Sequence, residues 1–313
     1  HLASLLHEVH PAAKIYNLDI VEPGTPLPTV KNYKPALGKG EEHAATFIYC
    51  DVRQPIELEK VNITPDDVIF NFAAVHRTPG HPDPAYFETN IRGAENVCAF
   101  AERHGIRKIV FTSSIAPYGA AEELKEETTL PMPNTPYGIS KLVAEKIHQT
   151  WQAGGEGRQL TIVRPGVVFG RGENGNFTRL YWGIRGHKFM YPGRKDTIKA
   201  CIYVKELVRF MLYRLEHHDS GVELYNCCYE PAYTIEHIVE SMKRVTNMKV
   251  KVPFMPGWLI MTAAGIAGAL GSPMGICPAR VRKLQISTNI CGKKLSASGY
   301  RFRYTFEEAL ADW

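Results

Sequence analysis

The residues with the clearest chemical potential are a tyrosine and a lysine, Tyr137 and Lys141, four residues apart in a segment of helical character. In a helix this spacing places both side chains on one face, one turn apart. A lysine ammonium within a few ångströms of a phenol favours the phenolate, and such a neighbour typically moves a pKa by roughly 1–3 units. With a serine hydroxyl opposite, these residue types predict an acid/base centre that interconverts an alcohol and a ketone.

The serine that fits this role is Ser114, in the run Thr112-Ser113-Ser114 that follows an apolar strand at 108–111. Tyr137 comes about one crossover later along the chain. A Tyr-x-x-x-Lys spacing also arises by chance in structural helices, but a serine at the end of a strand upstream favours the catalytic interpretation. We therefore predict that Ser114, Tyr137 and Lys141 are catalytic.

The bulk composition is that of an ordinary globular protein. The chain has 313 residues, 44% of them hydrophobic and 22% charged, which allows two domains. A net charge of +5 suits an anionic small molecule or an acidic membrane surface, and no basic run is dense enough to indicate nucleic acid. Seven cysteines without a metal-ligand spacing favour reduced thiols and no metal site. With no recognisable signal peptide, we expect a cytoplasmic protein.

Strand and helix patterns alternate through the first half of the chain, which predicts an α/β fold with a Rossmann-like, doubly wound parallel sheet. We assign this domain to residues 1–165 and a smaller substrate-binding lobe mainly to 166–313, with about 200–230 returning to the first domain. Ligands of such sheets bind beyond the carboxyl ends of the strands. The expected strand ends are Asp19, Asp51, Ala73, Ser114 and Pro165.

The start of the chain reads as the second half of a dinucleotide-binding unit. A helix at 1–9 leads to a strand that ends in Asp19, whose carboxylate would bond the adenosine ribose. The Asp19 carboxylate would repel the 2′-phosphate of NADP, and Ile20-Val21-Glu22 supplies no arginine to bind that phosphate. NAD is therefore favoured over NADP. The glycine-rich turn of such units lies about 20 residues earlier, so we expect that turn and the first strand to be absent from this sequence. Alternatively, Asp19 only ends a strand.

Several other residues are placed to contact the cofactor or the substrate. Asp51 and Val52 suit the adenine edge, the small residues at 73–74 allow close approach, and Asn90 would support the tyrosine or the cofactor. The predicted cofactor-binding residues are Asp19, Asp51, Val52, Phe72, Ala73, Ala74, Asn90, Thr112, Tyr137, Lys141 and Pro165.

Beyond residue 170, polar loops carry basic side chains that suit a diphosphate, although any one of them could be a solvated surface charge. The predicted substrate-binding residues are His76, Ser114, Asn176, Arg179 and Lys199; His76 could instead be incidental. Residues 22–44, rich in proline, glycine and lysine, indicate a surface loop.

Two features suggest larger partners. Residues 254–279 contain no charged side chain, but prolines and glycines divide them. This pattern is compatible with a buried or substrate-covering helix and with a peripheral membrane contact. A true membrane span is the least favoured alternative. The two long helices expected at 85–104 and 137–151 carry more apolar surface than one sheet face needs, which favours a homodimer.

Together these motifs resemble the extended short-chain dehydrogenase/reductase family, and within it the NAD-dependent epimerase/dehydratase group that acts on nucleotide sugars. The resemblance rests on Asp19, Asp51-Val52, Asn71-Phe72-Ala73-Ala74, Asn90, Thr112-Ser113-Ser114, Tyr118-Gly119, Tyr137 to Lys141 and Arg164-Pro165-Gly166. It implies a Rossmann fold, NAD as cofactor, Ser114 and Tyr137 acting on the substrate hydroxyl, and Lys141 also binding the nicotinamide ribose.

Departures from the family narrow the chemistry. Ile115-Ala116 stands where sugar dehydratases have an acid and other members a cysteine, and Val167 stands where sugar epimerases often have an asparagine. We therefore expect epimerisation of a nucleotide-diphospho-sugar at C4 through a transient ketone. The alternatives are a dehydrogenase or reductase of a sugar, sterol or lipid-linked substrate, and a catalytically silent NAD-binding or membrane-scaffold protein.

Overall fold

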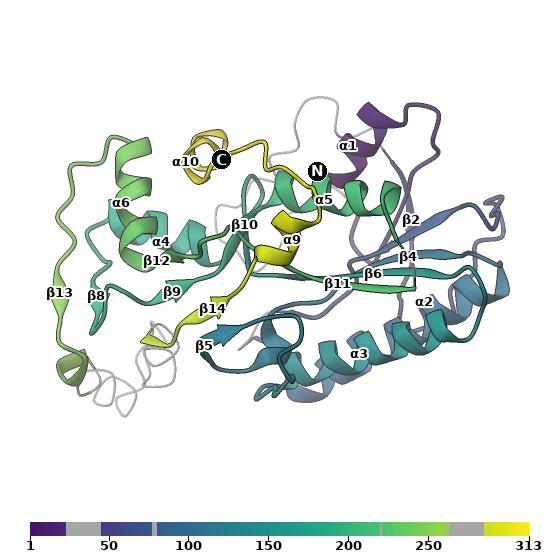
Figure 1. Ribbon diagram of the computed structural model, residues 1–313, viewed down its shortest axis with the longest axis horizontal. Helices are drawn as coiled ribbons and strands as arrows, with labels where there is room; N and C mark the ends of the chain where they lie inside the picture. Colours follow the sequence, from purple (N-terminus) through teal and green to yellow (C-terminus); the bar gives the residue numbers. More distant parts are fainter. Residues whose placement is uncertain (23–44, 77–79, 220, 261, 263–284) are drawn as a thin grey trace.

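The computed structural model describes residues 1–22, 45–76, 80–219, 221–260, 262 and 285–313, and it has the predicted α/β architecture (Figure 1). Its central sheet has four parallel strands in the order β11-β6-β4-β3, and a separate parallel pair joins β1 to β2. The strands are β1 (Tyr16–Asp19), β2 (Thr46–Tyr49), β3 (Val68–Asn71), β4 (Lys108–Thr112), β6 (Gln159–Pro165) and β11 (Val222–Cys227).

Helices cover both faces of the central sheet. In Figure 1, α2 (Asp83–Arg103) and α3 (Pro136–Ala153) lie below it, whereas α1 (Leu2–Val9) and α5 (Val204–Glu216) lie above it. Parallel strands need such crossover connections, so the strands are buried on both faces and read as continuous apolar runs. The predicted doubly wound sheet is confirmed.

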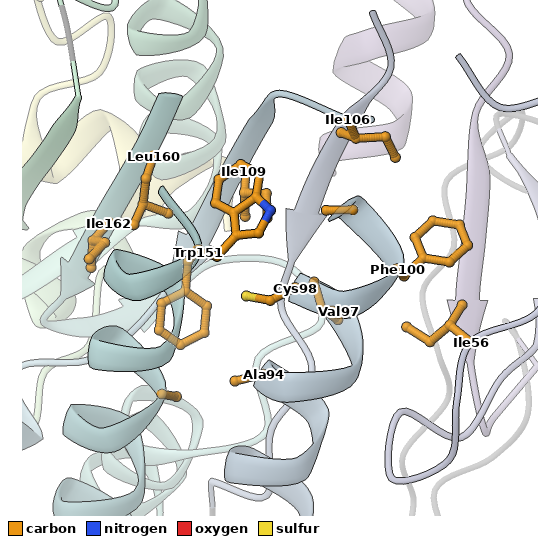
Figure 2. Packing of buried hydrophobic residues seen from close by; sticks show 13 residues of the cluster. Ile56, Ala94, Val97, Cys98, Phe100, Ile106, Ile109, Trp151, Leu160 and Ile162 are labelled. Atoms are coloured by element: carbon orange, nitrogen blue, oxygen red, sulfur yellow. The ribbon is translucent and has the colours of Figure 1, made fainter. Parts of the chain in front are cut away.

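The alternation of side chains along β4 divides the hydrophobic core into two layers. Ile109 and Phe111 face α2 and α3, where they belong to one cluster with Trp151. Figure 2 shows Ile109 and Trp151 in this cluster. Val110, between them in sequence, points to the opposite face and packs with Phe210 of α5. This period of two is the normal geometry of a strand, and it lets one short strand contribute to both layers.

The remaining part of the chain builds a second lobe, which lies at the left of Figure 1. Its own core gathers aromatic residues around Phe169, which stacks on Phe177 with a centroid distance of 4.6 Å. The helices of this lobe are α4 (Asn176–Arg185), α6 (Ile235–Val245) and α10 (Phe306–Asp312). The short helix α9 (Lys293–Ala297) packs instead on β11 of the central sheet. The short strands are β5 (Ala121–Lys125), β7 (Val167–Phe169), β8 (Tyr191–Pro192), β9 (Ile198–Lys199), β10 (Cys201–Tyr203), β12 (Tyr233–Thr234), β13 (Phe254–Met255) and β14 (Thr288–Ile290).

Two segments singled out in the sequence lie mostly outside the described residues. These are the loop expected at 22–44 and residues 263–279 of the uncharged stretch. Within the described part of the chain, no helix is both long and apolar enough to cross a bilayer. The six cysteines in that part are free thiols.

Candidate active site

The start of α3 places Tyr137 against the end of β4. Thr135 caps the helix by accepting a hydrogen bond from the Gly138 backbone N–H at 3.1 Å, and Pro136 occupies the first turn, where its missing N–H costs nothing. A Cβ at position 138 would lie 2.6 Å from the carbonyl oxygen of Ala116. Glycine is therefore needed for α3 to begin this close to the short helix η2 (Ala116–Tyr118).

Ser114 lies two residues beyond the end of β4, and its hydroxyl interacts with the phenol of Tyr137. The same hydroxyl accepts from the Ala116 backbone N–H at 3.1 Å, which fixes its position. Burial raises the pKa of Tyr137, and the bond with Ser114 opposes this effect. The lowering of this pKa expected from Lys141 was wrong, because burial is the largest influence on the phenol.

Lys141 lies one turn beyond Tyr137 and is almost completely buried, with 2% of its surface exposed. Its Nζ donates to the carbonyl oxygen of Thr112 at 2.6 Å and lies 4.3 Å from the centroid of the Phe111 ring. Burial lowers the pKa of Lys141 to about 7, while the nearby Glu145 carboxylate raises it. The structure thus brings Ser114, Tyr137 and Lys141 together in one place.

The inner face of α3 continues as a polar face after Lys141. Glu145, at 1% exposure, accepts two hydrogen bonds from Arg164 of β6, at 2.8 and 2.6 Å, and one from the Ser113 hydroxyl at 2.5 Å. His148, further along, is fully buried and lies 3.2 Å from the Asn71 amide nitrogen. Burial lowers the pKa of His148 to about 4, so at neutral pH it is uncharged.

Asn90 links the loop after β3 to the start of α3. Its side chain accepts from the Val75 backbone N–H at 2.8 Å, and its amide donates to the Val75 carbonyl and to the Ser140 hydroxyl. These bonds tie the loop after β3 to both α2 and α3. Asn71 holds the same loop, because its side-chain oxygen accepts from the Ala73 backbone N–H at 3.1 Å.

The acids predicted to bind the adenosine end lie at the carboxyl ends of β1 and β2. Asp19 is exposed, and its carboxylate accepts from the Val21 backbone N–H at 3.1 Å. Asp51 pairs with Arg53 through contacts of 2.6–2.9 Å, and hydrogen bonding from Arg53 lowers the pKa of that carboxyl. Val52 packs against α2 instead, since a Cβ at Gly93 would lie 3.0 Å from its side chain.

The predicted substrate residues are not gathered into one group. Asn176 and Arg179 lie one turn apart on the exposed side of α4 and bond each other at 3.0 Å. Lys199 of β9 donates to the Ile286 carbonyl at 2.7 Å, and burial lowers its pKa to about 8. His76 is exposed after β3.

One observation at the site fits the dinucleotide predicted from the sequence. The Thr112 hydroxyl is buried at the end of β4 and has no hydrogen-bond partner among the described residues. Buried polar groups are normally paired, so this hydroxyl, beside Lys141, is available for a ligand. Pro165 ends the neighbouring β6, and Phe72 stays 46% exposed after β3.

Sequence reasoning missed the side chains that hold this centre in place, namely Ser113, Glu145, His148 and the Arg164 side chain. A signal was present for two of them, because Glu145 and His148 continue the i, i+4 face of Tyr137 and Lys141. A glutamate and a histidine on the inner face of a helix that packs on a sheet require buried partners. The identity of those partners depends on the tertiary fold.

Comparisons with known proteins agree with this geometry. Residues 21–228 match the model of the NAD dependent epimerase/dehydratase family. The chain is 32% identical over 266 residues to N-acetyl-alpha-D-glucosaminyl-diphospho-ditrans,octacis-undecaprenol 4-epimerase of Escherichia coli O157:H7, covering 83% of this chain and 80% of the relative. It is 33% identical over 250 residues to UDP-glucose 4-epimerase of Lacticaseibacillus casei, covering 70% of this chain and 73% of that protein.

Solved structures share the fold at low sequence identity. UDP-N-acetylglucosamine 4-epimerase of Methanobrevibacter ruminantium, in complex with UDP-N-acetylmuramic acid, superposes with a TM-score of 0.73 at 19% identity, covering 100% of this chain and 93% of that one. UDP-glucuronic acid 4-epimerase of Bacillus cereus, in complex with NAD, gives 0.72 at 18% identity, covering 100% and 92%. The extent of the family match and the identity to the relatives establish that this chain belongs to the NAD-dependent epimerase/dehydratase family.

Proposed function

We propose that this protein is an NAD-dependent epimerase that inverts C4 of a sugar carried on a nucleoside diphosphate. The observation that carries the proposal is the contact of the Ser114 hydroxyl with the Tyr137 phenol, one helical turn from the buried Lys141. The proteins similar to this chain include 4-epimerases of two kinds of diphospho-sugar. When bound, NAD would supply the acceptor and donor of the C4 hydride that an inversion through a ketone requires.

The three side chains divide the proton chemistry. Tyr137, as the phenolate that the Lys141 ammonium stabilises, takes the proton of the C4 hydroxyl and becomes the phenol, while Ser114 holds the same oxygen by a hydrogen bond. When the ketone is reduced, Tyr137 returns the proton to the oxygen. Burial raises the pKa of Tyr137, which makes the phenolate a stronger base once it is formed.

The residues that would hold NAD lie at successive strand ends. Asp19 and Asp51 would contact the adenosine, the small residues Ala73 and Ala74 would admit the dinucleotide, and Val52, Phe72 and Pro165 would line its path. Lys141 and the unpaired Thr112 hydroxyl would hold the nicotinamide ribose. His76, Asn176, Arg179 and Lys199 stay candidates for binding the diphosphate.

The decisive variant is Tyr137→Phe, which removes only the phenolic oxygen. We expect turnover of UDP-glucose or UDP-N-acetylglucosamine to fall by about 10²–10⁴-fold, the usual size of an acid/base contribution. The matched control is Tyr213→Phe, whose hydroxyl donates to the Ser298 carbonyl at 2.9 Å. Product would be followed by proton NMR of the anomeric signal. Full turnover by Tyr137→Phe would exclude the assigned mechanism.

Net redox chemistry distinguishes an epimerase from a dehydrogenase or reductase. An epimerase recycles its cofactor, so NADH absorbance should stay constant while product forms. Steady NADH production in step with loss of substrate would instead favour the dehydrogenase alternative. If neither product nor NADH forms, the result would favour a catalytically silent NAD-binding protein.

A second candidate substrate is a sugar carried on a polyprenyl diphosphate. The relative from Escherichia coli is named for such a substrate, and three apolar side chains are exposed at the end of the second lobe: Phe254 at 52%, Trp258 at 71% and Leu259 at 41%. A parallel assay with undecaprenyl-diphospho-N-acetylglucosamine in detergent decides between carriers. If only the lipid-linked sugar is turned over, the carrier of the sugar is a polyprenyl diphosphate and not a nucleoside diphosphate.

The same apolar side chains suggest a peripheral contact between a cytoplasmic protein and an anionic lipid surface. Lys249 and Lys251, just before β13, are exposed and complement anionic headgroups. We expect Trp258→Ser to reduce co-sedimentation with vesicles of phosphatidylglycerol and phosphatidylethanolamine severalfold. The control is Trp182→Ser, which replaces a tryptophan on α4 that is 59% exposed. This control should not reduce co-sedimentation. An equal effect of both changes would contradict the contact.

A homodimer through α2 and α3 completes the proposed assembly. Ile139 is 39% exposed, and Val143, Phe87 and Ile91 stay partly exposed on the two helices. We expect Ile139→Asp to yield monomers by light scattering coupled to gel filtration. Leu124→Asp, at a 49% exposed apolar residue of β5, serves as the control. A wild-type chain that is already monomeric would refute this assembly.

A further inference from the structure

Behind the catalytic centre lies a buried polar cluster that the proposed proton chemistry does not use. It consists of Ser113, Glu145 and Arg164, which are 3%, 1% and 3% exposed. Each comes from a different element, namely the end of β4, α3 and β6. A carboxylate and a guanidinium are almost never buried this completely without a defined partner, so their arrangement is specific.

The Glu145 carboxylate is the centre of the cluster. One of its oxygens accepts from the Ser113 hydroxyl at 2.5 Å and from Arg164 Nε at 2.8 Å, and the other accepts from Arg164 Nη2 at 2.6 Å. This two-point contact with the guanidinium fixes the plane of the carboxylate. The serine therefore meets an acceptor that cannot rotate away.

Ser113 is held from both sides. Its hydroxyl bonds Glu145 on α3, while its backbone N–H donates to the Val163 carbonyl of β6 at 2.8 Å. The next residue is Ser114, whose hydroxyl contacts Tyr137 two helical turns before Glu145 on α3. The distance between the Ser114 loop and α3 is thus set at Ser113, and the same helix carries Tyr137.

We propose that Ser113, clamped by the Glu145–Arg164 pair, is a positioning residue that aligns the Ser114 hydroxyl with the Tyr137 phenol. This inference rests on the proposed function, because it acts through the assigned role of Ser114. Without the Ser113 hydroxyl, Ser114 loses one of the anchors that hold it beside Tyr137. Small misplacements of reacting groups reduce rates strongly, so the effect should appear in kcat.

Ser113→Ala is a clean perturbation because Glu145 keeps both bonds from Arg164. We expect kcat with the sugar substrate to fall about tenfold, with KM changed less than about twofold, as for a group that acts mainly in the transition state. The matched control is Ser241→Ala. Ser241 is also fully buried and also donates to a glutamate, Glu307, at 3.3 Å, but it lies in α6 of the second lobe. It should leave kcat unchanged.

A double-mutant cycle with Ser114→Ala separates positioning from a general loss of structure. If Ser113 acts through Ser114, Ser113→Ala should change kcat by less than about twofold in the Ser114→Ala background. An equal tenfold loss in both backgrounds, or no loss in the wild type, would overturn the inference and leave the proposed function standing. Full turnover by Ser114→Ala would instead remove the assigned role of Ser114, and the inference with it.

Discussion

The most direct test of the buried cluster is Glu145→Leu, because this change leaves the Arg164 guanidinium without its acceptor. The side chains of Arg164 and Glu145 are 4% and 1% exposed, so water does not replace the lost contacts. Burial lowers the pKa of Arg164, but hydrogen bonding and charge attraction to Glu145, together with smaller effects of Tyr118, raise this pKa overall, so the guanidinium stays charged. Its Nη1 already has no partner within the described residues. The variant thus creates an uncompensated buried charge.

The expected magnitude follows from these contacts. Three charge-assisted hydrogen bonds are lost, two from Arg164 and one from Ser113. Each such bond is worth about 1.5–3 kcal/mol, and breaking one side of a buried pair costs about 3–5 kcal/mol. We expect the free energy of unfolding to fall by about 4 kcal/mol. Asp66→Leu is the matched control, since its pair with Arg107 at 3.0 Å is exposed at 88% and 55% and should contribute less than about 1 kcal/mol.

The assay is equilibrium urea unfolding followed by tryptophan fluorescence, with the double variant Glu145→Leu/Arg164→Met included. Replacing both members of a buried pair by apolar side chains removes the uncompensated charge, so the double variant should recover much of the lost stability. If Glu145→Leu costs no more than Asp66→Leu, or the double variant is less stable than the single one, the description of this cluster is wrong.

Two further changes test the geometry of α3. Burial depresses the pKa of Lys141 to about 7 from its usual value of 10.5. Between pH 7 and pH 10.5 the unfolded chain therefore binds more protons than the folded chain. The free energy of unfolding of the wild type consequently rises with pH, by at most about 1.4 kcal/mol per pH unit. The stability of Lys141→Met relative to the wild type should therefore decrease from pH 7 to pH 10 in urea unfolding, and a constant difference would contradict this. Gly138→Ala should reduce both melting temperature and kcat, because the added Cβ would lie 2.6 Å from the Ala116 carbonyl oxygen. Gly183→Ala, whose Cβ would lie 3.4 Å from Phe189, should preserve kcat and change stability by no more than about 1 kcal/mol.

The parts of the site that follow from local periodicity were predictable from the sequence. The i, i+4 spacing of Tyr137 and Lys141 fixes their common face whatever the rest of the fold does, and an apolar run that ends in serines marks a strand end. The parallel sheet followed from the alternation of such strands with helices. These signals need no knowledge of which segments meet in space.

The properties that depend on distant partners were not predictable. The pKa of Tyr137 depends on how completely other elements bury its phenol, and burial reverses the direction expected from Lys141 alone. Asn90 was expected to support the tyrosine or the cofactor, and its side chain is bonded to Val75 and Ser140, which are 15 and 50 residues away in sequence. Such pairings are decided by tertiary packing, so residue type and spacing leave them open.

The partners of the inner face of α3 explain why the proposed catalytic centre forms at this edge of the sheet. Lys141 bonds the end of β4, Glu145 bonds Arg164 near the end of β6, and His148 contacts Asn71 at the end of β3. These are three neighbouring strands in the order β6-β4-β3. One helix therefore fixes the carboxyl ends of three strands relative to one another through buried polar contacts, which have stricter geometry than apolar packing. Since ligands of parallel sheets bind at these ends, the contacts that align the strands also align Ser114 with Tyr137.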